Sequence, residues 1–120
     1  MKAILLVSHG SHSSKTVDEV AALTKQIKKQ RKDDFVSFAF LEILSPSIPD
    51  GIAQCVKNGA TEIIILLNFL NSGKHVDEDI PRIIREAGVK YPRVKFQLTS
   101  PVGQHPRIIE LFLDIVHRHE

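Results

Sequence analysis

Two histidines and one glutamate follow apolar runs of this sequence: His9, Glu42 and, at the end of a loop of eight residues, His75. Imidazole and carboxylate groups bind first-row divalent ions, with Zn–N and Zn–O distances of about 2.0–2.2 Å. A neutral imidazole also accepts a proton near neutral pH, and a neighbouring carboxylate stabilises the imidazolium that forms. These residue types therefore predict a divalent-metal site or a proton-transfer site, and their pattern alone does not separate the two roles.

The three side chains come together only if their apolar runs are neighbouring parallel strands. Residues 3–7 and 63–67 are continuous apolar runs, typical of central parallel strands that are buried on both faces. Residues 36–41 and 94–98 alternate between apolar and polar side chains, which predicts strands nearer the edges. His9 and His75 then lie at the same end of the sheet, where Glu42 can join them.

Helical patterns separate these strands, and polar residues mark where the helices begin. Thr16 with Glu19 forms a capping-box pattern, and Ser47 is a good N-cap for a second helix. We expect the third helix to begin near residues 77–81 and the fourth around residues 105–106. We expect the second helix to end at Gly59 and the third at Gly88. The fourth helix is expected to bury one apolar face, formed by Ile108, Leu111, Phe112, Ile115 and Val116.

Strict alternation of four strands and four helices predicts one doubly wound, flavodoxin-like α/β domain over residues 1–120, with a four-stranded parallel sheet and helices on both faces. Ligands of such sheets bind beyond the carboxyl ends of the strands. The loops that follow the strands are therefore the candidate site.

Composition limits the classes of function. With 42% apolar residues, 25% charged residues and a net charge of +2, the 120-residue chain is typical of a globular domain and lacks the basic excess of a dedicated nucleic-acid binder. Its single cysteine, Cys55, excludes an internal disulfide and fits a reducing compartment. No run approaches the roughly 20 apolar residues of a membrane span. We expect a cytoplasmic protein that binds neither nucleic acid nor membrane.

The remaining rim residues allow several interpretations. Gly10 and Gly73 permit close backbone approach to a ligand or serve ordinary turns. His12 either supports a neighbouring site residue without touching the ligand or is a solvated loop residue. His105 either caps a helix or contacts a ligand. His117 and His119 lie near the chain end, where we give them little functional weight. No nucleotide-binding glycine motif and no hydrolase nucleophile elbow occurs.

Four segments in order resemble the short-form sirohydrochlorin cobaltochelatases, small members of the class II tetrapyrrole chelatases. They are Val7-Ser8-His9-Gly10-Ser11, Phe40-Leu41-Glu42 with Pro46-Ser47-Ile48, Phe69-Leu70 leading to Gly73-Lys74-His75 with Asp79-Ile80-Pro81, and Pro101-Val102-Gly103 to His105-Pro106. The resemblance covers essentially the whole chain. It implies insertion of a divalent metal, Co²⁺ first, into sirohydrochlorin during cobalamin biosynthesis, without an organic cofactor.

The resemblance also implies roles for particular residues. His9 and His75 match the family's metal-binding and proton-accepting pair, and Glu42 matches an acidic catalytic position at the same rim. Backbone and polar groups nearby are expected to hold the tetrapyrrole: Gly10, Ser11, Asn71, Ser72, Gly73 and Lys74. Basic side chains near helix starts are candidates for the substrate's carboxylates: Lys15, Lys74, Arg82, Arg85 and Arg107.

Size and the resemblance together imply a homodimer. A macrocycle needs a cleft with two walls, and one sheet of this size offers chiefly one. The half-length family form pairs two chains, and two-fold dimers are the commonest symmetric assembly. Three alternatives stay open: insertion of nickel or iron into the same class of tetrapyrrole, as in sirohaem or nickel-tetrapyrrole biosynthesis, a non-catalytic module that binds metal or tetrapyrrole, and an interaction domain with structural histidines.

Overall fold

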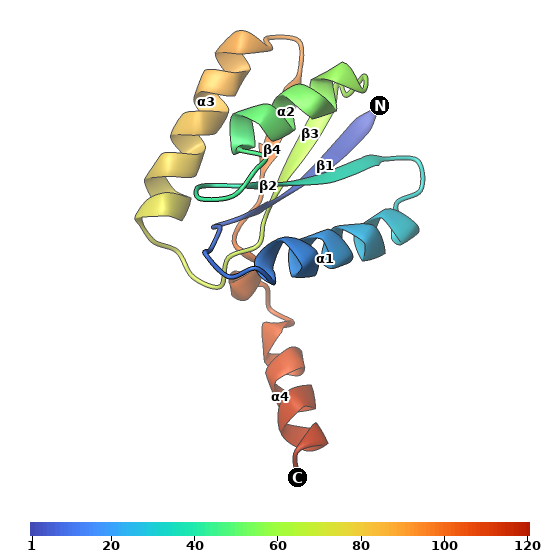
Figure 1. The fold of residues 1–120 in the computed structure, drawn as a ribbon, viewed down its shortest axis with the longest axis vertical. Helices are drawn as coiled ribbons and strands as arrows, with labels where there is room; N and C mark the ends of the chain where they lie inside the picture. The colour runs from blue at the N-terminus through green and yellow to red at the C-terminus, as the bar shows by residue number, and fades with distance from the viewer.

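Four strands form a single parallel sheet in the order β2-β1-β3-β4. The computed structural model describes all residues 1–120. The strands are β1 (Lys2–Ser8), β2 (Phe35–Phe40), β3 (Glu62–Leu67) and β4 (Lys95–Leu98). The two continuous apolar runs are the central strands and the two alternating runs are the edges, which confirms the prediction from the sequence (Figure 1).

Helices cover both faces of the sheet unequally. They are α1 (Thr16–Gln30), α2 (Ile48–Lys57), α3 (Ile80–Lys90) and α4 (Ile108–Arg118), with short turns η1 (His75–Asp79) and η2 (Val102–Gln104). Helices α2 and α3 pack on one face over the larger apolar core, and α1 packs on the other over a smaller one (Figure 1). The doubly wound α/β class is confirmed. No helix combines the length and apolarity that crossing a membrane requires.

The predicted helix ends are partly right. Ser47 caps α2 by accepting a hydrogen bond from the Asp50 N–H at 3.2 Å, and Gly59 follows α2 with φ of +93°. The capping box at Thr16 is wrong, because its hydroxyl donates instead to Ser11 Oγ at 2.9 Å. The stop at Gly88 is also wrong, since α3 continues to Lys90. A glycine inside a helix costs only about 1 kcal/mol relative to alanine, which packing of α3 on the sheet offsets.

The burial predicted for the last helix is wrong within this chain. Four of its expected core residues are more than half exposed, and Ile108 is only half-buried. They are Leu111, Phe112, Ile115 and Val116. The physical reason is placement, because α4 projects away from the domain and packs chiefly against η2 (Figure 1).

Cys55 gives the first testable prediction. Its fully buried thiol packs in the larger core, and burial raises its pKa from 9.0 to about 11, although a backbone hydrogen bond lowers it slightly. Between these values the unfolded chain releases the proton and the folded chain keeps it, so stability falls as pH rises from 9 to 11. We expect a loss on the order of 2 kcal/mol that C55A does not share.

Thermal unfolding of wild type and C55A at pH 8 and pH 10.5 measures this difference. All other side chains are the same in both proteins, so the comparison isolates the thiol. An equal fall in Tm for both proteins contradicts the prediction.

Candidate metal centre

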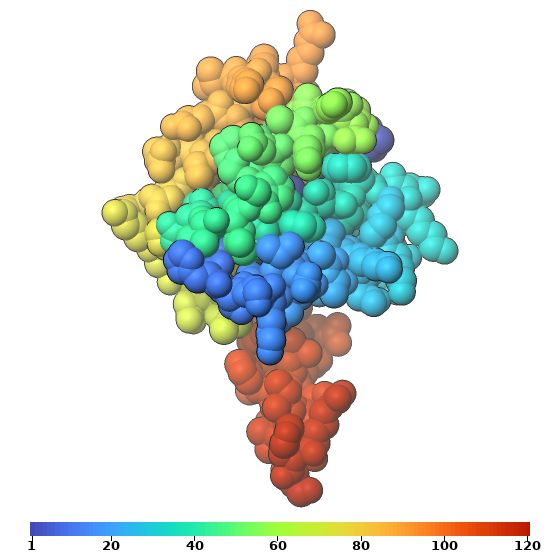
Figure 2. Space-filling model, viewed as in Figure 1, coloured from blue at the N-terminus to red at the C-terminus, as the bar shows by residue number.

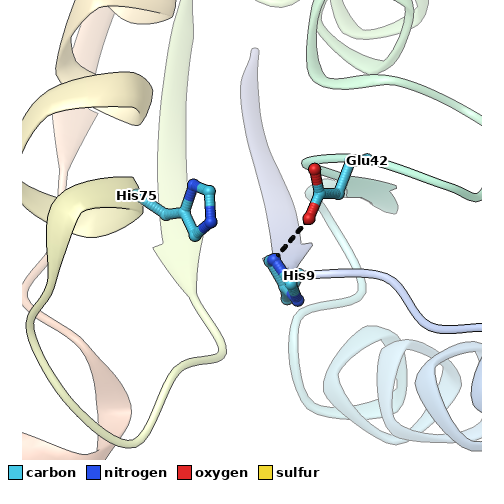
Figure 3. Close-up of side chains that lie close together, drawn as sticks. All are labelled: His9, Glu42 and His75. Atoms are coloured by element: carbon cyan, nitrogen blue, oxygen red, sulfur yellow. Dashed lines mark ion pairs between the residues drawn. The ribbon is translucent and has the colours of Figure 1, made fainter.

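Three side chains from three loops gather at the carboxyl edge of the sheet. His9 follows β1, Glu42 follows β2, and His75 opens η1 after β3. One ligand atom from each lies within 4.8 Å of the others, and Figure 3 shows the two imidazoles on either side of the space that Glu42 borders. The parallel sheet thus brings together the three residues that sequence reasoning selected.

Backbone pairing beyond the strands holds Glu42 against His9. The Leu41 N–H donates to Ser8 O at 2.9 Å and the Glu42 N–H to His9 O at 3.0 Å. Glu42 Oε1 then lies 2.7 Å from His9 Nε2, and the two form an ion pair when the imidazole is protonated (Figure 3). Gly10 makes this approach possible, because its φ is +105° and a Cβ there would lie 1.9 Å from Glu42 O.

A carboxylate that sequence reasoning did not select as a site residue orients His75. Asp79 Oδ2 lies 2.7 Å from His75 Nδ1, so that ring nitrogen carries the proton and Nε2 is left as the ligand atom. The two imidazole rings are 5.0 Å apart between centroids and tilted by 40°. The sequence does contain a pattern that could have identified Asp79: it lies four residues after His75, a spacing that places both side chains on one face of a helix.

The ligand set is open to solvent. The side chains of His9, Glu42 and His75 are 45%, 48% and 46% exposed. An ion pair at this exposure contributes only about 0–1 kcal/mol to stability. The cluster therefore does little to hold the fold together, and its accessibility suits a group that meets an incoming ligand.

Two grooves meet at His9. The larger, about 430 Å³, runs from His9 to His75. It is lined by residues 68–76 as well, including the predicted Asn71, Ser72, Gly73 and Lys74. The second, about 370 Å³, lies between the first loop and α1 and includes Gly10. Asn68, which sequence reasoning did not assign to the site, lines both grooves and donates to Ser8 Oγ at 3.0 Å.

Several other predicted residues have partners within the chain. Ser11 Oγ accepts hydrogen bonds from the Ser13 N–H and the Thr16 hydroxyl, so it organises its own loop. His105 Nδ1 accepts from the Arg107 N–H at 3.0 Å, in the turn that precedes α4, and no side chain caps the helix itself. His12 is exposed, and His117 and His119 lie on the projecting helix.

The predicted cations divide into two groups. Arg82 lies 3.9 Å from Asp79 and 3.7 Å from Glu86, and Arg107 pairs with Glu110 at 3.1 Å. Three others have no carboxylate partner within the chain: Lys15, Lys74 and Arg85. Of these, Lys74 lines the larger groove beside His75.

The geometry gives an arriving metal ion a partly assembled set of ligands. Two ligands of one tetrahedral ion at about 2.0–2.1 Å are separated by about 3.3 Å, wider than the 2.7 Å between His9 Nε2 and Glu42 Oε1. Binding of one ion by both atoms therefore requires them to move apart by about 0.6 Å. Three protein ligands also leave at least one coordination position free for another molecule.

Comparisons with known proteins agree with this arrangement. The CbiX family model matches residues 3–119. The chain is 38% identical to the sirohydrochlorin cobaltochelatase of Methanococcus maripaludis, over 95% of this chain and 96% of that one. It is 32% identical to the sirohydrochlorin ferrochelatase of Priestia megaterium, over 98% of this chain but 44% of the relative, so it spans less than half of that longer protein. Among solved structures, the cobalt complex of the sirohydrochlorin chelatase SirB from Bacillus subtilis subspecies spizizenii matches with a TM-score of 0.85 and 31% identity, over 98% of this chain and 50% of that one.

Gly10 provides a test of how the centre is built. G10A forces a side chain into a positive φ and against Glu42 O, so we expect a loss of about 2 kcal/mol or more and weakened Co²⁺ binding. G73A is the matched control, because Gly73 lies in the larger groove and a Cβ there meets no atom within 4 Å. Thermal unfolding and Co²⁺ titration measure both effects. Equal behaviour of the two variants contradicts the tight contact at Gly10.

Proposed function

This chain belongs to the CbiX family, and we propose that it inserts a divalent metal ion into the tetrapyrrole sirohydrochlorin. One observation carries the proposal: the half-exposed His9, Glu42 and His75, with ligand atoms within 4.8 Å of one another, border an open groove. A chelatase must hold its ion loosely enough to give it up, and two or three protein ligands suit that task better than a closed set of four.

Insertion exchanges two pyrrole N–H protons for one M²⁺, so the site needs bases as well as ligands. The ion first binds to the imidazole and carboxylate ligands, and the ring nitrogens then occupy its open positions. As metal–nitrogen bonds to the ring form, the protein ligands leave the ion. The freed imidazoles and carboxylate accept the two pyrrole protons and pass them to solvent, which their exposure permits.

The hydrogen bond from His75 to Asp79 supports this cycle. It keeps the proton on Nδ1, so Nε2 stays available to bind the metal and later to accept a pyrrole proton. We propose that His9 and His75 bind the metal and that all three residues take part in catalysis.

The carboxylates of the substrate are best bound by basic side chains that have no carboxylate partner within this chain. Lys74, beside His75 in the larger groove, meets this condition, and Lys15 at the start of α1 is a second candidate. Arg82 and Arg107 are weaker candidates, because each already faces a carboxylate. We propose that Gly10, Asn71, Ser72 and Gly73 contribute backbone or polar contacts to the ring.

We propose Co²⁺ as the metal and cobalamin biosynthesis as the context. A relative that this chain matches along nearly its whole length is named a cobaltochelatase, and one similar SirB structure contains cobalt. Iron is the direct competitor, since other relatives are named ferrochelatases. Imidazole and carboxylate ligands do not discriminate strongly between neighbouring first-row ions, so nickel belongs in the same test.

We also propose that two copies pair around the macrocycle, because one sheet edge supplies chiefly one wall of a cleft. The expected location is the cytoplasm, where a lone buried cysteine stays reduced.

Anaerobic insertion tests the activity directly. The absorption change of sirohydrochlorin with Co²⁺, Fe²⁺ or Ni²⁺ is followed after subtraction of the enzyme-free rate. We expect the wild type to accelerate insertion, fastest with Co²⁺, and H9A and H75A each to lower kcat/KM by at least about 100-fold. E42Q is expected to lose a similar amount, because it neither binds the ion strongly nor accepts a proton.

H117A is the matched control, since it removes a histidine outside the site and should retain wild-type rates. If Fe²⁺ or Ni²⁺ is inserted faster than Co²⁺, the proposed metal is wrong but the proposed chelatase activity is not. If the wild type inserts metal no faster than the enzyme-free background but still binds metal or tetrapyrrole, the protein is a non-catalytic binding module and the proposed activity is wrong.

A further inference from the structure

Ser8 is the buried residue from which the loop after β1 departs. It ends β1, is only 5% exposed and directly precedes His9. Its backbone is tied to the β2 side of the sheet, because its carbonyl accepts a hydrogen bond from the Leu41 N–H at 2.9 Å. On the β3 side the backbone pairing reaches only Val7, whose carbonyl accepts the Asn68 N–H at 2.8 Å. Backbone pairing therefore leaves Ser8 without a link to β3.

The side chain of Asn68 supplies that link. Its amide Nδ2 donates to Ser8 Oγ at 3.0 Å and so joins residues that are 60 positions apart in the sequence. Asn68 is half-buried and lines both grooves that meet at His9. Beyond this contact, residues 69–75 form no hydrogen bond and no ion pair with residues 9–15. The Asn68 amide is thus the last polar link before the two loops separate.

The two loops are otherwise attached to different parts of the chain. The loop after β1 (residues 9–15) is attached to the segment after β2 through the Glu42 N–H and His9 O. The loop after β3 (residues 68–74) is attached to η2, because the Gly103 N–H donates to Phe69 O at 3.0 Å. Figure 2 shows both loops at the surface, the first in blue and the second in yellow-green, on the side from which α4 projects.

The two imidazoles of the metal centre depend on the relative position of these loops. His9 begins one loop and His75 follows the other, and their ring centroids are 5.0 Å apart. The Phe69 ring also meets the His9 ring at 67°, with the centroids 6.5 Å apart. Ring contacts of this kind occur over a wide range of distances, whereas a hydrogen bond has a narrow one. The contact between Asn68 and Ser8 is therefore the sharper restraint on where His9 lies.

We propose that Asn68 is a positioning residue of the metal centre, whose amide holds Ser8 and thereby sets the place of His9 relative to His75. In its effect on metal insertion this role rests on the proposed function, whereas ion binding tests it separately. Asn68 acts through His9 and is not itself a ligand. Imidazole is the better ligand for late first-row ions, and amide carbonyls suit harder ions such as Mg²⁺ and Ca²⁺.

The burial of Ser8 explains why the contact constrains the site. Removal of the Asn68 amide leaves a buried hydroxyl without its donor, which is unfavourable, whereas removal of both polar groups is nearly neutral. The end of β1 then has no polar link toward β3, and His9 loses its fixed distance from His75.

Titration of the full-length chain with Co²⁺ tests the proposal without any tetrapyrrole. We expect N68A and S8A each to raise the Kd for Co²⁺ about 5- to 10-fold, because each removes one side of the same contact. The double variant should bind no more weakly than the weaker single variant, since the two residues act as a pair. N58A is the matched control, because the Asn58 amide donates to Gln54 O at 2.8 Å at the end of α2, outside the site. N58A should bind Co²⁺ like the wild type.

A second titration asks whether Asn68 acts through His9. In the H9A background, where Glu42 and His75 remain as ligands, N68A should change the Kd less than about 2-fold, because the ligand that it positions is gone. An undiminished effect of N68A in H9A shows that Asn68 contacts the ion itself, and it overturns the positioning role. Wild-type affinity in S8A overturns it as well.

Thermal unfolding separates this role from a purely structural one. N68A and N58A each lose one amide hydrogen bond. If N68A lowers the Tm but leaves the Kd for Co²⁺ unchanged, the contact supports the fold alone and the proposal is wrong. If N68A does not fold, S8A breaks the same contact from the other side and carries the test.

The insertion assay distinguishes the positioning role from the proposed function. N68A should lower kcat/KM mainly by raising the KM for Co²⁺, because a displaced His9 weakens capture of the ion more than its release. If the wild type inserts no metal but the Co²⁺ affinities change as expected, the proposed function is wrong and the positioning role stands. Normal insertion with wild-type Co²⁺ affinity in N68A gives the reverse conclusion.

Discussion

Parallel register at the carboxyl edge of the sheet is the constraint on which the site depends. Ser8 pairs with Phe40 and Val7 with Leu67, so β1, β2 and β3 end at nearly the same level. Residues far apart in sequence therefore follow the end of β1 and the ends of its two neighbours, each about 4.8 Å from it. The hydrogen bond from Glu42 N–H to His9 O extends this pairing past the strands, and Gly10 allows the two loops to approach. Without this alignment His9, Glu42 and His75 are three unrelated polar residues.

The arrangement balances holding an ion against releasing it. Asp79 orients one imidazole and Glu42 lies 2.7 Å from the other, so the ligand atoms are placed before any ion arrives. Yet all three side chains are about half exposed, and no fourth protein ligand joins the cluster. The neighbouring groove leaves space on the open side of the ion. Such a site suits transfer of an ion to another molecule better than permanent storage.

The strands, their central or edge positions and the gathering of the three site residues were predictable, because burial patterns and parallel topology depend on local composition. Asp79 was not selected, since its role depends on a helical turn that begins at His75 itself. The capping box at Thr16 failed because the loop offered its hydroxyl a different partner, Ser11. The burial predicted for α4 was wrong, because the apolar period shows which face of the helix is suited to burial but not where the helix lies relative to the domain.

X-ray absorption spectroscopy of the Co²⁺-loaded protein tests the central claim, that this edge binds a divalent ion through two imidazoles and one carboxylate with a position left open. The account predicts two imidazole nitrogens and at least one protein oxygen at about 2.0–2.2 Å, with solvent oxygen completing the shell. The imidazole signal should fall by half in H75A. A shell made only of oxygen, or an imidazole signal unchanged in both H9A and H75A, would contradict it.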